Sequence, residues 1–333
     1  MSTFPVILNE LKQQKYFPIY FLHGEEPYFI DKVSKYIEDN VLDEAEKGFN
    51  QTIIYGRDAN VDDIILSARR PPMMAPFQVI IVKEAQQLKR IEEFEKYFNQ
   101  PLETTILVIC HKYKKADKRK KYLKSVMAKG VVFESSKLYE SQIPKWIHDY
   151  VATKGMSINP KSTVLLSEFL GNDLQKISNE IDKLKLIIND NREITPEIIE
   201  ENIGISKDFN VFELQKALAF KDAFKAFQIT KFFGENSKNH PIFQTLPALA
   251  RFFNLVLTIQ YSKNKNPKEL SRLIGVNPFF MNDYMHASRA YSAMKVTEII
   301  HEIKIADLKS KGVDSGYLPE KEILKELIYK ILN

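Results

Sequence analysis

The sequence predicts an α/β domain at the amino-terminal end of the chain, followed by a remainder that is all α. Two observations carry this prediction. Over residues 1–138, short apolar runs alternate with amphipathic helical patterns, an arrangement typical of a parallel sheet with covering helices. From Leu138 onward the strand signals stop and only helical periodicity remains, which favours helical packing for the rest of the chain.

The strands expected in the α/β part are short, rich in branched apolar residues and bounded by breakers. They cover residues 19–22, 52–55, 79–82, 105–109 and 131–133. Helical patterns between them cover residues 28–41, 61–70, 91–98 and 118–129.

The helical remainder shows four short patterns, at residues 141–154, 161–170, 174–188 and 196–203. The last of them follows Thr195 and has Pro196 at its first position, a clear helix start. Residues 210–333 are helical throughout and rich in phenylalanine. We therefore expect three domains: an α/β domain at 1–138, a small helical domain at 139–209 and a larger helical bundle at 210–333.

The composition is that of an ordinary globular protein. The 333 residues carry a net charge of +5, which is not the strong basic footprint of a dedicated nucleic-acid binder. Cys110 is the sole cysteine, which excludes an internal disulfide and a cysteine-cluster zinc site. The amino terminus lacks a signal-peptide pattern, and no uninterrupted apolar run approaches the roughly 20 residues of a membrane helix. We expect a cytoplasmic protein.

The loop after the first strand is where a nucleotide-binding α/β domain would hold phosphate with a GxxxxGK[ST] motif. This chain has Gly24, Glu25, Glu26 and Pro27 there. Carboxylates repel phosphate and proline lacks an amide donor, so the sequence predicts a degenerate nucleotide site in this loop. Lys83 likewise follows the strand at 79–82, where a carboxylate would hold magnesium. We expect no ATP hydrolysis, no cofactor and no metal.

Other catalytic patterns are absent from the sequence. The six histidines form no HExxH pair or comparable metal spacing, and no GxSxG motif occurs. His23 lies beside Gly24, but no serine or cysteine motif accompanies it, which favours a structural role. We predict no catalytic residue.

The segment from Arg69 to Phe77 precedes the strand at 79–82. Pro71 and Pro72 end the preceding helix, so Met73 and Met74 lie just beyond it, outside regular structure. Two interpretations stay open. The methionines either cap the helix–sheet core or present a flexible apolar surface to a partner's pocket.

A basic run at residues 111–124 is the densest cluster of charge. Its lysines and arginine either contact phosphates, DNA or an acidic partner by electrostatics, or form the solvated start of a helix after a buried strand. The candidate contact residues are Lys114, Lys115, Lys118, Arg119, Lys120 and Lys121.

Four stretches of the sequence carry a family resemblance. They are YFLHGEEPYFID at 20–31, ARRPPMMAPFQVIIVKEA at 68–85, DKRKKYLK at 117–124 and GNDLQKISNEIDKL at 171–184. Asp307, Lys309 and Gly312 match a weaker closing pattern. In this order and spacing they resemble the delta subunit of the bacterial DNA polymerase III clamp loader, and the likeness spans nearly the whole chain.

The resemblance implies a fold and a binding site. The fold is a P-loop-type, AAA+-like α/β domain with a degenerate nucleotide site, a small helical lid domain and a C-terminal helical collar for oligomerisation. Met73 and Met74, with Pro72 and Phe77 beside them, would form the apolar plug that enters a pocket of the sliding clamp. The family usually has Leu and Phe there, so the methionines are a departure that keeps apolar volume but loses the rigid ring.

The implied function is a non-catalytic subunit of the DNA-directed DNA polymerase holoenzyme. It would bind and open the ring-shaped sliding clamp (beta) for loading onto primed DNA during replication. The other implied partners are the tau/gamma and delta prime loader subunits and primed DNA, with no membrane. Two alternatives stay open: an active AAA+-type ATPase, and a stand-alone DNA-binding protein that acts through residues 112–124.

Overall fold

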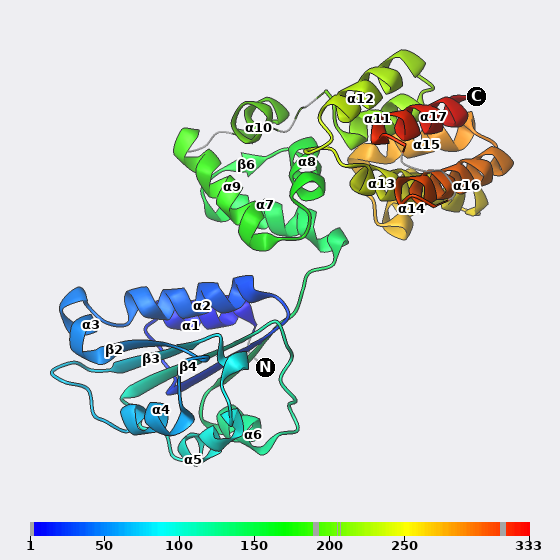
Figure 1. Cartoon of the computed structure of the whole chain (residues 1–333). Helices are drawn as coiled ribbons and strands as arrows, with labels where there is room; N and C mark the ends of the chain where they lie inside the picture. Colours follow the sequence, from blue (N-terminus) through cyan, green and yellow to red (C-terminus); the bar gives the residue numbers. More distant parts are fainter. Residues whose placement is uncertain (1–2, 189–192, 205, 207, 314–317) are drawn as a thin grey trace. The chain divides into compact units, whose positions relative to one another are not determined.

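The computed structural model describes residues 3–188, 193–204, 206, 208–313 and 318–333 (Figure 1). The chain divides into two compact units, Met1–Leu138 and Tyr139–Asn333, and each is described by itself. The division of the second unit into a lid domain and a collar domain near residue 209 stays a prediction.

The first unit is built on a five-stranded parallel sheet in the order β2-β3-β4-β1-β5. All five predicted strands are confirmed, with ends that differ by at most a few residues. Strands β1 and β3 are buried almost throughout, because helices cover both faces of the sheet. The strands are β1 (Ile19–Gly24), β2 (Gln51–Tyr55), β3 (Gln78–Lys83), β4 (Thr105–Lys112) and β5 (Val131–Ser135).

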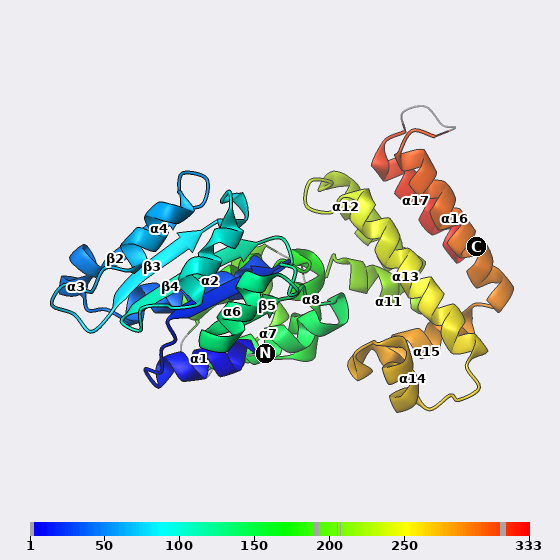
Figure 2. The ribbon, with the colours of Figure 1, turned by 90° about the horizontal axis from the view of Figure 1, so that it is seen from below.

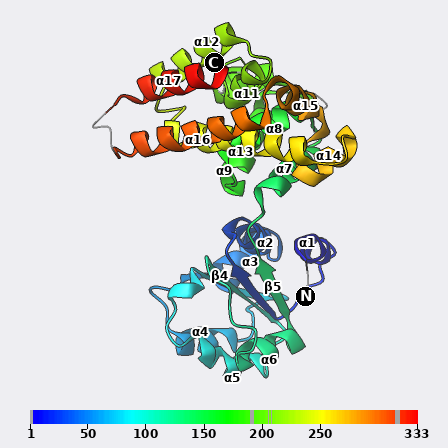
Figure 3. The same ribbon diagram turned by 90° about the vertical axis from the view of Figure 1, so that its right-hand side faces the viewer.

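Helices α1 and α2 cover one face of this sheet, and α4, α5 and α6 cover the other (Figures 1 and 3). The sequence did not predict α1 or α3. It also placed the start of α6 at Lys118, but residues 117–120 form a turn in which the Lys120 N–H donates to the Asp117 carbonyl. The bounds are α1 (Phe4–Lys12), α2 (Pro27–Asn40), α3 (Glu44–Asn50), α4 (Val61–Ala68), α5 (Glu95–Phe98) and α6 (Lys121–Lys129), with 3-10 turns at Ala85–Gln87 and Ile91–Phe94.

The second unit begins with four helices that match the four predicted patterns. They are α7 (Ile143–Thr153), preceded by a 3-10 turn at Glu140–Gln142, then α8 (Pro160–Leu170), α9 (Leu174–Ile187) and α10 (Pro196–Ile203). The expectation that strands stop after Leu138 is wrong. Strands β6 (Ser157–Ile158) and β7 (Glu193–Ile194) form a parallel pair, too short to produce an alternating pattern in the sequence.

The rest of the second unit is a helical bundle with an apolar core. In Figures 2 and 3, α16 lies along α17, and α13 packs against α16. The aromatic residues Phe233, Phe252 and Phe253 are fully buried in this core. The helices are α11 (Val211–Ala219), α12 (Ala223–Glu235), α13 (Ile242–Tyr261), α14 (Pro267–Ile274), α15 (Met281–Ala290), α16 (Ala293–Ser310) and α17 (Glu320–Leu332), with a 3-10 turn at Pro278–Phe280.

Among the described residues, α13 alone is long and apolar enough to cross a membrane by length and composition. Arg251 and Asn254 are exposed polar residues on the side of this helix away from its buried residues. Its buried side chains, Leu249 and Phe252 among them, pack within the core of the bundle, which accounts for its apolar character.

Candidate functional site

The segment between α4 and β3 carries two exposed methionines. Met73 is 63% exposed and Met74 is fully exposed, so neither side chain caps the helix–sheet core. Pro72 is half-buried, and the ring of Phe77 packs edge-on against Tyr16 with centroids 5.4 Å apart. Of the four predicted contact residues, the structure thus turns Met73 and Met74 toward solvent and uses Phe77 partly as an anchor to the core.

Several hydrogen bonds fix the start and the middle of this segment. The carbonyl of Ala68, the last residue of α4, accepts from Thr105 Oγ1 at 2.9 Å and from Tyr97 Oη at 3.3 Å. Further along, the side-chain amide of Asn50 bonds both backbone groups of Met73. Met74 follows with φ +55°, in the left-handed region.

The sequence did not point to Asn50. It lies 23 residues from Met73, and its side chain is buried at the end of α3. An asparagine between a helix and a strand carries no local pattern that would distinguish it from an ordinary turn residue. Its partner is revealed by the fold alone.

The loop after β1 is closed by its own side chains. The carboxylate of Glu26 accepts from the Tyr28 N–H at 3.0 Å and so occupies the amino-terminal end of α2. Ser135 Oγ donates to the Glu26 carbonyl at 2.6 Å, and the Glu26 N–H donates to the Ser135 carbonyl at 3.2 Å. A helix amino terminus is where phosphate would bind, and here a carboxylate already fills that place.

Gly24 lets this loop lie against β5. Its φ is +139°, and a Cβ atom built on it would meet the Ser135 carbonyl oxygen at 2.0 Å. Glu25 is exposed, whereas Pro27 is the first residue of α2. The four residues of the predicted degenerate loop therefore form a short, tightly packed turn.

Lysines neutralise the carboxylates near the ends of the central strands. Lys83 Nζ lies 3.0 Å from Glu38, and Lys112 Nζ lies 2.7 Å from Asp31 and 3.2 Å from Glu84. Burial opposes ionisation of Glu38, but hydrogen bonds from Lys35 and Lys83 outweigh it and lower the pKa of that carboxyl. Within the described residues, no three metal-binding side chains come together.

His23 and Cys110 are both buried in the α/β core. The Nδ1 atom of His23 accepts from the Ala116 N–H at 3.1 Å, and burial lowers the pKa of His23 to about 4, so the ring is neutral at pH 7. Burial raises the pKa of the Cys110 thiol to about 12. His23 thus holds the loop before α6, and Cys110 fills core space.

The basic run at 111–124 is partly neutralised within the chain. Lys115 and Lys118 pair with Glu134, and Arg119 lies 3.0 Å from Asp117. Four further lysines are exposed, and the described part of the chain offers them no ion pair. These are Lys114, Lys120, Lys121 and Lys124. Only part of the predicted cluster is therefore available to an outside anion.

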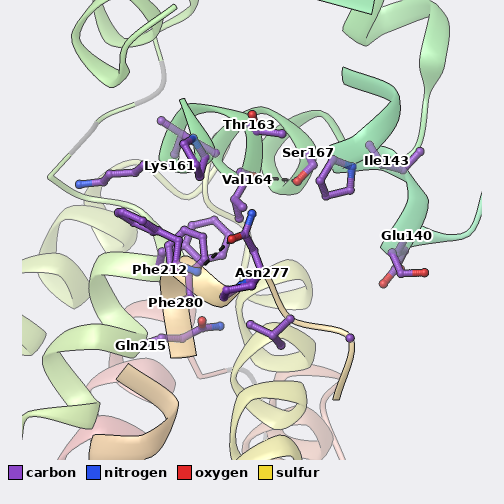
Figure 4. A pocket seen from close by; sticks show the side chains of 18 of the residues that line it. Glu140, Ile143, Lys161, Thr163, Val164, Ser167, Phe212, Gln215, Asn277 and Phe280 are labelled. Atoms are coloured by element: carbon purple, nitrogen blue, oxygen red, sulfur yellow. Dashed lines mark hydrogen bonds between the residues drawn. The ribbon is translucent and has the colours of Figure 1, made fainter. Parts of the chain in front are cut away.

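A cavity of about 1080 Å³ lies within the second unit (Figure 4). Lys161 on α8 pairs across it with Glu213 on α11 at 2.8 Å, and Arg251 pairs with Glu140 at 3.1 Å. The ring of Phe212 stacks on Phe280 with centroids 5.8 Å apart. Two ion pairs therefore neutralise part of the lining of this cavity, which the sequence did not predict.

Comparison with known proteins gives consistent matches. The family described as DNA polymerase III, delta subunit matches residues 20–136. The DNA polymerase III subunit delta of Bacillus subtilis is 24% identical and covers 96% of this chain and 94% of its own. The probable DNA polymerase III subunit delta of Aquifex aeolicus is 21% identical over 223 residues, 63% of this chain and 62% of its own.

Among solved structures, the DNA clamp loader delta protein of Bacillus subtilis aligns with a TM-score of 0.56 at 22% identity, over 99% of both chains. The fold class expected from the sequence, a parallel-sheet α/β domain followed by a helical remainder, is confirmed. The family resemblance found in the sequence is confirmed as well.

Proposed function

We propose, from the premise that this chain is a relative of the DNA polymerase III delta subunits and has a role in replication, that it binds and opens the sliding clamp. One observation supports this most strongly. Two adjacent methionines are exposed on a segment whose backbone is fixed to the α/β core. Exposed apolar side chains on a fixed backbone suit docking into a partner's pocket.

The proposed action is mechanical. Met73 and Met74 enter an apolar pocket of the clamp, and burying each side chain contributes roughly 1.5–3 kcal/mol. Binding opens the ring only if the subunit holds the opened clamp more tightly than the closed one. ATP binding to neighbouring tau/gamma subunits would control access, while the helical bundle would contact those subunits and delta prime. Because the clamp is loaded onto primed DNA, the proposed location of the chain is the cytoplasm.

The same proposal assigns no ATP hydrolysis to this chain. Glu26 places a carboxylate at the amino terminus of α2, and Lys83 and Lys112 lie among the carboxylates that would otherwise be free for magnesium. The alternative, an active ATPase, requires nucleotide binding to this site. Titration of the purified chain with a fluorescent ATP analogue and magnesium distinguishes the two functions. Saturable micromolar binding would contradict a non-catalytic role.

Clamp binding is tested with the purified chain and the sliding clamp of the same organism. We expect micromolar or tighter binding that weakens by more than about a hundredfold in Met73→Ala/Met74→Ala. The matched control is Met127→Ala/Met294→Ala, which removes two other exposed methionines, on α6 and α16. Equal binding by wild type and the first double variant would move the contact elsewhere, and no binding by wild type would reject the function.

A further inference from the structure

We infer that Asn50 is a positioning residue for the Met73–Met74 segment, and this inference rests on the proposed clamp-binding role of that segment. The Oδ1 atom of Asn50 accepts from the Met73 N–H at 2.7 Å, and its Nδ2 atom donates to the Met73 carbonyl at 3.0 Å. The same Nδ2 atom lies 3.2 Å from the Glu46 carbonyl. One side-chain amide thus pairs with both backbone groups of a residue 23 positions away.

The segment has few other means of holding its shape. Pro71, Pro72 and Pro76 lack N–H donors, so they cannot join a backbone ladder. Among the described residues, the hydrogen bonds found for the backbone of residues 71–77 are the two to Asn50. Asn50 itself is only 2% exposed, so its amide is held by the core and does not compete with water for these bonds.

The backbone at Met74 shows why this support matters. A φ of +55° is unfavourable for a residue with a side chain, and such a conformation persists only where neighbours determine it. Asn50 fixes Met73 on one side, while Ala75 and Phe77 pack against the core on the other. Met74 is held between these two anchors with its side chain fully in solvent.

A backbone that is ordered before binding reduces the entropy lost when the methionines dock. Asn50→Ala removes both hydrogen bonds to Met73, and we expect clamp affinity to fall about tenfold or more. Asn50→Asp keeps an acceptor for the Met73 N–H but turns a carboxylate oxygen toward the Met73 carbonyl. Clamp affinity of this variant should fall at pH 8 and recover toward wild type as the pH is lowered, because the protonated carboxyl donates again.

Three measurements test the inference together. Clamp affinity is measured for wild type and both Asn50 variants from pH 8 to pH 5.5, each as a ratio to wild type at the same pH. Amide hydrogen exchange at residues 71–77 is measured in the free chain. Thermal unfolding confirms that each variant is folded. The controls are Asn40→Ala and Asn40→Asp. Each removes a hydrogen bond from a side-chain amide to a backbone carbonyl, that of Tyr36, at the end of α2.

The expected result is faster exchange near Met73, weaker clamp binding and recovery of Asn50→Asp at low pH, with the Asn40 variants unchanged. Normal exchange, or fast exchange with undiminished clamp affinity, would overturn the inference while leaving the proposed function intact. Failure of wild type to bind the clamp would reject the proposed function, and the positioning role with it. Faster exchange across the whole α/β unit would show that Asn50 acts through general stability and would also overturn it.

Discussion

Two loops of the α/β unit lie at opposite edges of the same parallel sheet and have opposite character. The turn at Gly24–Pro27 follows the carboxyl end of β1, and the segment at Arg69–Phe77 precedes the amino end of β3. Ligands of α/β domains usually bind at the carboxyl ends of the strands. Here that edge is closed by internal contacts, and the opposite edge exposes apolar side chains.

The difference teaches how a binding domain can change its ligand without changing its fold. At the closed edge, Glu26 fills the helix terminus, and lysines pair with Glu38, Asp31 and Glu84. At the open edge, Asn50 fixes the backbone at Met73, but the side chain of Met74 is fully exposed to solvent. The closed edge thus buries its functional position, whereas the open edge leaves Met73 and Met74 exposed to solvent.

The largest expected effect comes from placing a charge at the open edge. Met74→Asp should weaken clamp binding by more than about a hundredfold, because a carboxylate cannot be buried unpaired in an apolar pocket. Since Met74 is fully exposed, the variant should unfold at the same temperature as the wild-type protein. The control at the closed edge is Glu25→Ala, and a similar loss of affinity there would erase the contrast between the edges.

The next effect concerns buried His23 beside the closed edge. Burial lowers the pKa of His23 from 6.5 to about 4, with the charge of Glu134 acting in the opposite direction. Between these values the unfolded chain binds a proton that the folded chain does not, so stability falls as the pH is lowered. The free energy of unfolding should drop by about 2 kcal/mol from this residue between pH 7 and pH 5.

Urea unfolding of wild type and His23→Gln at both pH values measures this contribution. The neutral amide of the variant retains an acceptor but does not titrate, so its stability should change less over the same interval. An equal pH dependence in the two proteins would assign the acid sensitivity to other groups.

A smaller effect is expected from the cap that closes the nucleotide-like turn. Glu26→Ala leaves the Tyr28 N–H without its acceptor, and loss of a helix cap costs about 1 kcal/mol. Denaturant unfolding should show this loss, while clamp affinity stays at the wild-type value because the open edge is untouched. Gain of ATP binding by this variant would show that the carboxylate alone had closed the site.

The smallest effect concerns the exposed lysines near α6. Lys120→Ala/Lys121→Ala should weaken any binding of duplex DNA and reduce its salt dependence by a slope of about 2, because two phosphate contacts are lost. Lys115→Ala/Lys118→Ala is the matched control, since both lysines already pair with Glu134. Fluorescence anisotropy at several salt concentrations measures the DNA affinity of the two double variants. If affinity depends on salt equally in both, Lys120 and Lys121 do not contact DNA.

Much of the fold was predictable, because local apolar patterns determined it. The five strands of the sheet are continuous branched runs, and some helices have clear starts, such as Thr195 and Pro196 before α10. Helix α1 was missed because it buries mainly Ile7 and Leu11, too few positions for a recognisable period. The pair β6–β7 was missed because two residues cannot show alternation.

The site was less predictable, since its contacts join distant residues. The sequence indicated Met73 and Met74 but left open whether they lie in the core, because apolar residues are buried more often than not. Two partners of the basic run, Asp31 and Glu134, lie outside it on other elements of the α/β unit. Pairing of this kind depends on the register of the sheet, which no local pattern reveals.

The burial of Cys110 has a practical consequence for studying the open edge. The chain has one cysteine, and its thiol is enclosed in β4 with its pKa raised to about 12, so maleimide reagents should leave it untouched in the folded state. A Met74→Cys variant would then offer a single reactive thiol on the most exposed position of the segment. A dye attached there would report the surroundings of this position alone, without prior removal of the native cysteine.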